Sequence, residues 1–156
     1  MGAKYIYICR NPFDCCVSFF YHTKAMPEYE FQDGTFDEFF EMFIEGKVDF
    51  GDYFDHVLSW YEHRNDPNVL FLTYEDLKKD TATWVLKIAD FLGEEYEATS
   101  QDVLETPMSG EFVRKGVVGD WRNHFSADQI KRLKERIELK TRGSDLMRLW
   151  KDTDIP

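Results

Sequence analysis

Two short apolar runs, with amphipathic segments between and after them, dominate the hydrophobic pattern of the chain. The runs cover residues 4–9 and 68–73. Continuous apolar runs of this length are typical of parallel strands that are covered on both faces. We therefore predict a strand, then helices, then a second strand, which together form a crossover unit of an α/β fold with parallel strands flanked by helices.

The amphipathic segments predict helices because their apolar residues recur at helical spacing. Thr35 and Gly46 are typical residues before and after a helix, Gly93 ends a later one, and Ser126 opens another with a capping-box pattern. The apolar stripes are Phe13, Cys16, Val17 and Phe20; Phe36, Phe39, Phe40 and Phe43; Phe54, Val57, Leu58 and Tyr61; Trp84, Ile88 and Leu92; Ile130, Leu133 and Ile137; and, in a short closing helix, Leu146, Leu149 and Trp150. Residues 94–110 are acidic and aperiodic, which predicts a loop over or beside a site.

Length and composition predict a single domain over residues 1–156. The 156 residues are 43% hydrophobic and 17% aromatic, which is ample material for one core. The sequence contains no run of about 18 apolar residues, so it predicts no membrane span. The first residues lack the pattern of a secretory signal. We therefore expect a cytoplasmic protein with no membrane partner, while the sequence leaves the oligomeric state open.

The charge pattern bears on the kind of partner. A formal net charge of −11 argues against a broad nucleic-acid surface, which needs many cations to neutralise phosphates. One bound nucleotide needs only a few cations, and Arg114, Lys115 and Arg122 form a short basic island. We expect no nucleic-acid partner, and a local potential at this island that favours a small anion.

The cysteines and histidines predict neither a disulfide framework nor a metal site. Cys9, Cys15 and Cys16 are an odd number within eight positions, without the second pair or the histidines of a zinc site. Buried or half-buried free thiols are the favoured interpretation; a regulatory thiol at Cys15 or Cys16 is the alternative, since a helix start lowers a thiol pKa. The four histidines fit no ligand or triad spacing.

The first motif of chemical interest lies where the first predicted strand ends. Arg10 closes the strand, Pro12 suits the first helical position because it has no N–H to leave unpaired, and Ser18 follows two turns along. The free N–H groups at a helix start attract phosphate, and Arg10 can offer a bidentate fork. Alternatively, Arg10 only ends a strand and Ser18 is a polar flank of an amphipathic helix.

The second motif is Arg114-Lys115-Gly116, followed after two residues by Gly119-Asp120-Trp121. Two cations stand beside a glycine, whose backbone can approach a ligand closely. A solvated charged turn is the alternative. A tryptophan in a polar loop normally packs against something, so we expect the Gly119-Asp120-Trp121 triplet to be a structural anchor for the basic loop.

These motifs resemble the two signature regions of the cytosolic sulfotransferases, which match residues 4–22 and 113–128. The family transfers a sulfonate group from 3′-phosphoadenosine 5′-phosphosulfate (PAPS) to an alcohol, phenol or amine, without a metal. The resemblance implies a partial P-loop-NTPase-like sulfotransferase fold, PAPS as co-substrate and a small-molecule acceptor. The spacing Arg-Lys-Gly-x-x-Gly-Asp-Trp carries most of the specificity.

The resemblance also implies roles for individual residues in cofactor binding. Arg10 and Ser18 would bind the 3′-phosphate of the donor, as would Arg114, Lys115 and Gly116. Tyr74, in a Tyr-Glu-Asp triplet after the second predicted strand, would lie at the adenine. Thr99 opens a Thr-Ser-Gln triplet that matches a family Thr-Ser-Phe triplet.

Two departures from the family pattern qualify the expected activity. Complete members begin with a Lys-bearing loop of the type Pro-Lys-Ser-Gly-Thr-Thr-Trp and a histidine that acts as general base, and this chain contains neither. It therefore resembles the carboxyl-terminal portion, with no catalytic residue of its own. Gln101 stands where the family has a phenylalanine that stacks on adenine, and losing this stacking could remove roughly 1–3 kcal/mol of binding free energy. The substrate-side loop that follows looks shortened.

We thus expect a sulfotransferase-family protein that binds PAPS for sulfonate transfer to a hydroxyl or amine, as an incomplete chain that does not turn over alone. The alternative is a non-catalytic nucleotide-binding or interaction module. A third possibility, an ATP- or GTP-binding domain, is disfavoured because the sequence has no Gly-x-x-x-x-Gly-Lys-[Ser/Thr] loop.

Overall fold

The computed structural model describes residues 2–93 and 116–156. The chain divides into two compact units. The strand unit consists of residues 1–9 and 63–117, and the helical unit of residues 10–62 and 118–156. Each unit is described by itself below, and the single-domain organisation expected from the sequence stays a prediction.

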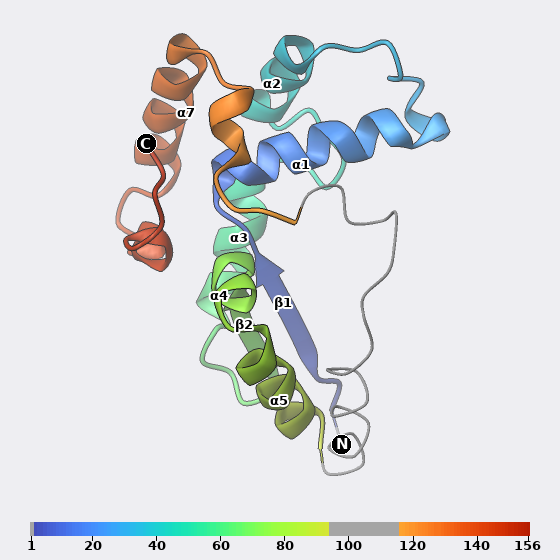
Figure 1. Cartoon of the computed structure of the whole chain (residues 1–156). Helices are drawn as coiled ribbons and strands as arrows, with labels where there is room; N and C mark the ends of the chain where they lie inside the picture. Colours follow the sequence, from blue (N-terminus) through green and yellow to red (C-terminus); the bar gives the residue numbers. More distant parts are fainter. Residues whose placement is uncertain (1, 94–115) are drawn as a thin grey trace. The chain divides into compact units, whose positions relative to one another are not determined.

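The strand unit contains two parallel strands followed by two helices (Figure 1). β1 (Tyr5–Cys9) pairs with β2 (Val69–Thr73), from Tyr5 opposite Val69 to Cys9 opposite Thr73. α4 (Tyr74–Lys79) and α5 (Thr81–Leu92) follow. Both predicted strands are confirmed, each beginning one residue later than expected. The separate short helix α4 was not predicted.

Local hydrogen bonds explain why α4 and α5 are two helices rather than one. The Thr73 hydroxyl accepts a hydrogen bond from the Asp76 N–H at 3.0 Å, which caps α4. The Asp80 carboxylate then accepts from the Thr83 N–H at 3.1 Å and caps α5. Aspartate competes for backbone N–H groups in this way and so favours a new helix start. α5 ends at Gly93, as predicted.

The strand unit buries little apolar surface in the part that the structure describes. Its buried hydrophobic residues are Cys9, Leu72 and Ala89, whereas Ile6 is 38% and Ile8 is 47% exposed. The prediction that both strands are covered on both faces is therefore wrong for β1. A two-stranded sheet with two helices after it does not supply the layers that would cover both faces.

The helical unit contains three α-helices from the first half of the chain and one from the second half. Their bounds are α1 (Pro12–Ala25), α2 (Phe36–Glu45), α3 (Tyr53–Glu62) and α7 (Ala127–Lys140), with the short 3₁₀ turns η1 (Pro27–Tyr29), η3 (Asp120–Asn123) and η4 (Leu146–Trp150). The caps predicted at Thr35, Gly46 and Ser126 are confirmed, with complete capping boxes at Thr35 and Ser126. Gly46 has a φ of 71°, and a Cβ there would lie 3.0 Å from the Cβ of Asp52.

An aromatic core holds the helical unit together. Its buried members are Phe13, Cys16, Val17, Phe20, Phe39, Phe40, Phe43, Phe54, Trp121, Phe125, Leu133 and Ile137. They come largely from the apolar stripes that the sequence predicted. Several rings meet edge to face, for example Phe40 and Phe125 with centroids 5.6 Å apart. Each fully buried phenylalanine contributes about 1.5–3 kcal/mol.

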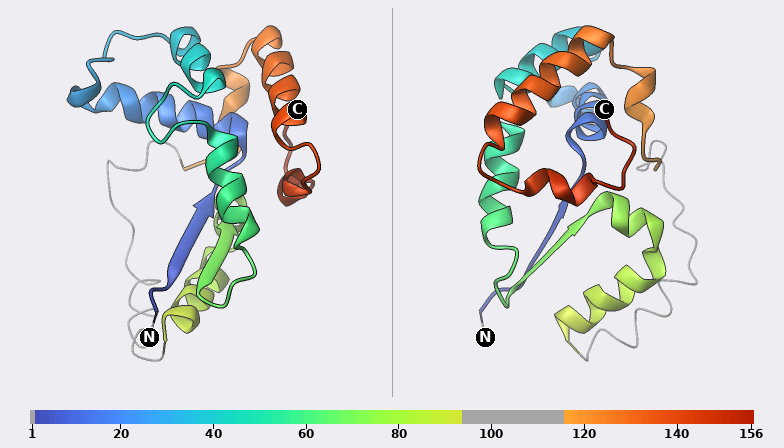
Figure 2. Two further views of the ribbon diagram at one scale, coloured as in Figure 1. Left: turned by 180° about the vertical axis from the view of Figure 1, so that it is seen from behind. Right: turned by 90° about the vertical axis from the view of Figure 1, so that its left-hand side faces the viewer.

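Polar contacts fix α7 against α2 and α3. Arg132 forms a bidentate pair with Glu41 of α2, at 2.6 and 2.7 Å. Arg136 bonds the Asp52 carboxylate, which stands before α3, at 2.7 Å. α2 and α7 accordingly lie close together in both views of Figure 2. Among the helices that the structure describes, none is long and apolar enough to span a membrane.

Candidate nucleotide-binding site

Arg10 lies at the junction between β1 and α1, as the sequence predicted. Its side chain is half-buried. Its backbone carbonyl accepts a hydrogen bond from the Tyr53 hydroxyl at 2.6 Å. Because Tyr53 begins α3 and packs in the core of the helical unit, this bond ties the backbone at Arg10 to that core.

Asn11 and Pro12 form the start of α1. The Asn11 side-chain oxygen accepts from the Asp14 N–H at 2.9 Å, and Pro12 occupies the first turn. Asn11 is fully buried. Asparagine is a favoured helix cap because its side chain satisfies one of the free N–H groups there. The predicted role of Pro12 is confirmed.

Asp14 joins the first motif to the second. Its side chain is 1% exposed. One carboxylate oxygen accepts from the Gly119 N–H at 2.7 Å and from the Asn11 side-chain amide at 3.0 Å, and the other accepts from the Trp121 N–H at 3.0 Å. The segment after Arg-Lys-Gly is thereby held against the first turn of α1, across more than 100 positions in the sequence.

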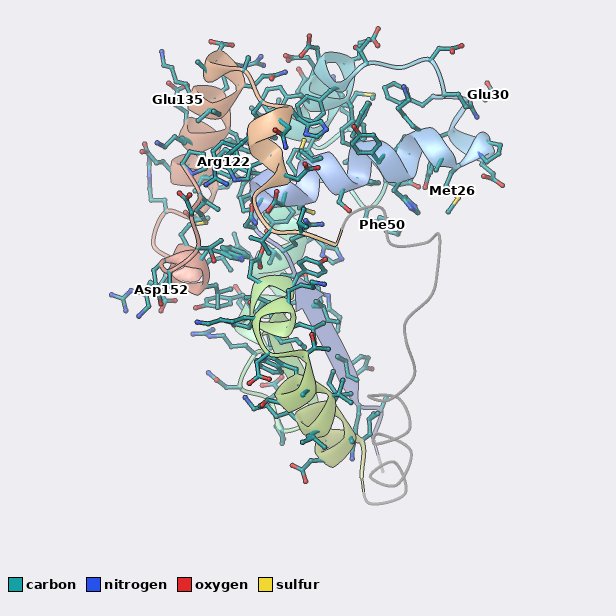
Figure 3. The ribbon with its side chains drawn as sticks, viewed as in Figure 1. Met26, Glu30, Phe50, Arg122, Glu135 and Asp152 are labelled. Carbon is teal, nitrogen blue, oxygen red and sulfur yellow. The ribbon has the colours of Figure 1, made fainter. Side chains whose placement is uncertain are left out.

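The Gly119-Asp120-Trp121 triplet is a structural anchor, as predicted. Gly119 has a φ of 93°, which a residue with a side chain rarely adopts. Trp121 is 7% exposed, and its ring lies 5.5 Å from that of Phe13. In Figure 3 the labelled Arg122 lies in η3, beside the first turns of α1.

The guanidinium of Arg122 makes several contacts within the protein. Its guanidinium stacks over the Trp121 ring at 4.6 Å and pairs with the Asp154 carboxylate. It also donates to the Asp154 carbonyl at 2.8 Å. The Asp154 carboxylate thus offsets part of the positive charge of the basic island expected from the sequence.

The first turn of α1 attracts an anion less than the sequence suggested. Asp14 places a carboxylate at the positive end of the helix dipole, and Asn11 occupies one of the free N–H groups. Both features reduce what the helix start alone can offer a phosphate. The role of Arg10 in binding an anion stays a prediction from the sequence.

The remaining predicted site residues are distributed as follows. Ser18 is an exposed residue of α1, so Arg10 and Ser18 both belong to the helical unit. Tyr74 begins α4 and is half-buried, and Gly116 has a φ of 62°; both belong to the strand unit. Thr99, Arg114 and Lys115 lie outside the described residues, as does the predicted loop over residues 94–110.

The thiols of the first motif differ in environment. Burial raises the pKa of the Cys16 thiol well above its ordinary value, and the neighbouring Cys15 adds to this. A buried thiol that stays protonated is a poor nucleophile, which argues against a regulatory role for Cys16. Cys15 is half-buried. Within residues 2–93 and 116–156, no group of three or more His, Cys, Asp or Glu side chains could hold a metal ion.

Comparison with known proteins identifies the family. The sequence matches the sulfotransferase domain family over residues 2–150. This chain belongs to the sulfotransferase family. Human sulfotransferase 1C2 is 36% identical over 169 residues, which cover 93% of this chain and 57% of that protein. Amine sulfotransferase from Oryctolagus cuniculus is 34% identical, over 95% of this chain and 58% of that protein.

Solved sulfotransferase structures resemble the chain as well. Mouse sulfotransferase SULT7A1 in complex with PAP superimposes with a TM-score of 0.78 at 37% identity, covering 96% of this chain and 62% of that one. Retinol dehydratase in complex with retinol and PAP gives a TM-score of 0.72 at 29% identity, over 91% and 48%. This sulfotransferase chain thus spans a little over half the length of the curated relatives, and its α/β fold with a parallel sheet agrees with the prediction.

Sequence reasoning missed Asn11 and Asp14. A signal for the cap was present, because an asparagine three residues before an acid resembles a capping box. The same spacing gave no sign that Asp14 accepts hydrogen bonds from the N–H groups of Gly119 and Trp121, since these residues are far from it in the sequence.

Proposed function

We propose that this chain is the donor-binding part of a sulfotransferase that uses PAPS as co-substrate and sulfonates a small-molecule acceptor with a hydroxyl or amine group. The observation that carries the proposal is the family match over residues 2–150, together with the hydrogen bonds that the Asp14 carboxylate accepts from Gly119 and Trp121 of the second signature motif. The PAP complexes of two structural relatives support the choice of nucleotide.

The 3′-phosphate of the donor is assigned to Arg10, Ser18, Arg114, Lys115 and Gly116. Arginine suits phosphate because its planar fork can donate two parallel, charge-assisted hydrogen bonds. The exposed hydroxyl of Ser18 can add a further one. Gly116 has positive φ and no side chain, so its N–H can come close to a ligand oxygen.

The adenine is assigned to Tyr74 and Thr99. Tyr74 is half-buried directly after β2, and an aromatic ring is a suitable surface for stacking of a base. Gln101 offers no aromatic face at the position where the family pattern has phenylalanine. Most of the affinity is therefore expected from the phosphate contacts, and the missing face lowers it by roughly 1–3 kcal/mol.

Sulfonate transfer also needs a base that takes the acceptor proton and a cation that stabilises the leaving phosphate oxygen. None of the 156 residues is assigned to either role. Positioning the donor can lower the barrier by several kcal/mol, but it does not replace these two groups. The family resemblance assigns both roles to the Lys-bearing loop and the histidine, neither of which is found in these 156 residues.

The test combines a binding and an activity measurement on the full chain. Calorimetric titration should show that 3′-phosphoadenosine 5′-phosphate (PAP) binds more tightly than adenosine 5′-phosphate (AMP). A sulfonation assay with a phenol and an amine acceptor should detect no turnover by the chain alone. Turnover should appear when the amino-terminal segment of a relative is fused in front of it.

The results separate the proposal from its rival, a non-catalytic binding module. The absence of an assigned base or oxyanion group within the sequence favours that rival. PAP binding with no turnover from the fused protein supports the module. Equal binding of PAP and AMP contradicts the assigned phosphate contacts, and turnover by the unfused chain contradicts the assignment of the catalytic groups.

The remaining expectations concern partners and location. The net charge of −11 supports a small-molecule partner rather than a nucleic acid. The cytoplasmic location and the absence of a membrane partner stay predictions from the sequence pattern.

A further inference from the structure

We infer that Asp14 is a positioning residue for the donor 3′-phosphate, although it need not touch the nucleotide. This inference rests on the proposed function. Its basis is a carboxylate that is 1% exposed and accepts hydrogen bonds from Asn11, Gly119 and Trp121, at 2.7–3.0 Å. Gly119 and Trp121 belong to the second motif, and Asn11 belongs to the first.

The carboxylate does more than cap a helix. The side chain of Asn11 already caps α1 by accepting the Asp14 N–H, so the oxygens of Asp14 are not needed for that purpose. A buried charge is costly unless it is fully hydrogen-bonded. In the part of the chain that the structure describes, Asp14 forms no ion pair, and its charge is balanced by N–H donors alone. Two of these donors, the N–H groups of Gly119 and Trp121, belong to one turn of the backbone, so the carboxylate binds that turn at two positions.

Both ends of this contact lie close in the sequence to residues that are assigned to the 3′-phosphate. Arg10 precedes Asp14 by four residues, and Gly116 precedes Gly119 by three. The backbone of Arg10 is held separately by the Tyr53 hydroxyl. Within the helical unit, Asp14 therefore holds the turn from Gly119 to Trp121 against the first turn of α1. A ligand gripped from two segments is sensitive to their spacing, because a displacement of about 1 Å weakens such contacts strongly.

Asp14→Asn is the direct test because it conserves shape and removes one acceptor. The new NH₂ group must face either the Gly119 N–H or the Trp121 N–H, so one donor meets another donor. The quantity to measure is the ratio of the dissociation constant for AMP to that for PAP, which isolates the 3′-phosphate. We expect the ratio to fall about tenfold, the value of one lost charge-assisted hydrogen bond. The affinity for AMP should change much less.

Asp52→Asn is the matched control. Asp52 is another largely buried carboxylate of the helical unit, but it bonds Arg136 and caps α3. We expect this variant to lower the melting temperature and leave the AMP-to-PAP ratio unchanged. A fall of the ratio in both variants would mean that loss of stability alone explains it, and would overturn the inference.

Gly119→Ala covers the case in which Asp14→Asn fails to fold. It disturbs the same turn from the other side, because its φ of 93° disfavours a side chain and a Cβ would meet the guanidinium of Arg122. The ratio should again fall, by a smaller factor. If wild-type protein prefers PAP but both variants keep the full ratio, the positioning role of Asp14 is wrong. If wild-type protein shows no preference, the proposed function itself fails.

Discussion

At the scale of single residues, the contacts that a charged side chain makes within the protein affect whether it can also bind a ligand. Arg10 and Arg122 both lie near signature motifs, yet Arg122 stacks on Trp121 and pairs with Asp154. These two contacts explain the position of the Arg122 side chain. Arg10 is half-buried, and its backbone is held by Tyr53. We therefore expect the two arginines to differ in their effect on nucleotide binding.

Arg10→Ala should weaken binding of PAP by roughly 10- to 100-fold, because a charge-assisted contact to phosphate is lost. Binding of AMP should weaken much less, since AMP lacks the 3′-phosphate. Arg114→Ala should act in the same way. Titration calorimetry with both nucleotides measures the effect, with Arg142→Ala, an exposed arginine after α7, as the control. Equal losses for PAP and AMP would contradict the assignment of Arg10.

At the scale of elements, α7 is attached to the helical unit through both apolar and ionic contacts. Leu133 and Ile137 enter the aromatic core. Arg136 and Lys140 bond Asp52, at 2.7 and 3.2 Å. Partial burial alone would raise the pKa of Asp52, but the hydrogen bonds from Arg136, the Asp55 N–H and Lys140 outweigh it, so the pKa lies below its usual value.

This lowered pKa gives the stability a defined dependence on pH. A carboxyl whose pKa is lower in the folded state contributes stability that is complete above its unfolded pKa, about 3.9, and is lost as the pH falls through the folded value. Asp52→Asn should therefore lower the free energy of unfolding by about 1–3 kcal/mol at pH 7. The difference from wild type should shrink below about pH 4. Urea denaturation at several pH values measures it.

An exposed ion pair provides the control for this experiment. Glu45 and Lys47 lie 2.7 Å apart with both side chains more than half exposed. Glu45→Gln should change the free energy of unfolding at pH 7 by less than about 1 kcal/mol, because solvent screens exposed pairs. A pH-independent difference between Asp52→Asn and wild type would show that the charge of Asp52 does not stabilise α7.

At the scale of the whole molecule, the two units differ in how much core they possess. In the described part of the chain, the strand unit buries only Cys9, Leu72 and Ala89 among its hydrophobic residues. The helical unit contains the aromatic core. Local stability follows the number of buried apolar contacts, so the two units should not open with the same free energy.

Native-state hydrogen exchange followed by mass spectrometry tests this difference. Backbone amides of β1 and β2 should exchange at least about tenfold faster than those of α1 and α7, which corresponds to roughly 1.4 kcal/mol in opening free energy. The measurement needs no ligand and no variant. Equal protection of strands and helices would mean that the chain opens as one cooperative unit.

Much of the fold could be predicted because its signals are local. Phe36, Phe39, Phe40 and Phe43 mark one face of α2 through their spacing alone, and Thr35 caps that helix through an interaction three residues long. The exposure of Ile6 and Ile8 was not predicted. Their sequence has the apolar character of a covered strand, but coverage depends on which layers the rest of the molecule supplies.

The candidate site divides in the same way. The sequence by itself determined the family, through the order and spacing of Arg10, Ser18 and the Arg-Lys-Gly-x-x-Gly-Asp-Trp motif. Each motif spans only a few residues, so it can be recognised without the tertiary structure. Only the tertiary structure decided that Asp14 holds Gly119 and Trp121 and that Arg122 is taken up by Asp154. These partners lie 32 to 107 positions apart. The spacing of residues in the sequence does not show which distant polar groups will form hydrogen bonds, because that depends on how the helices of the helical unit pack.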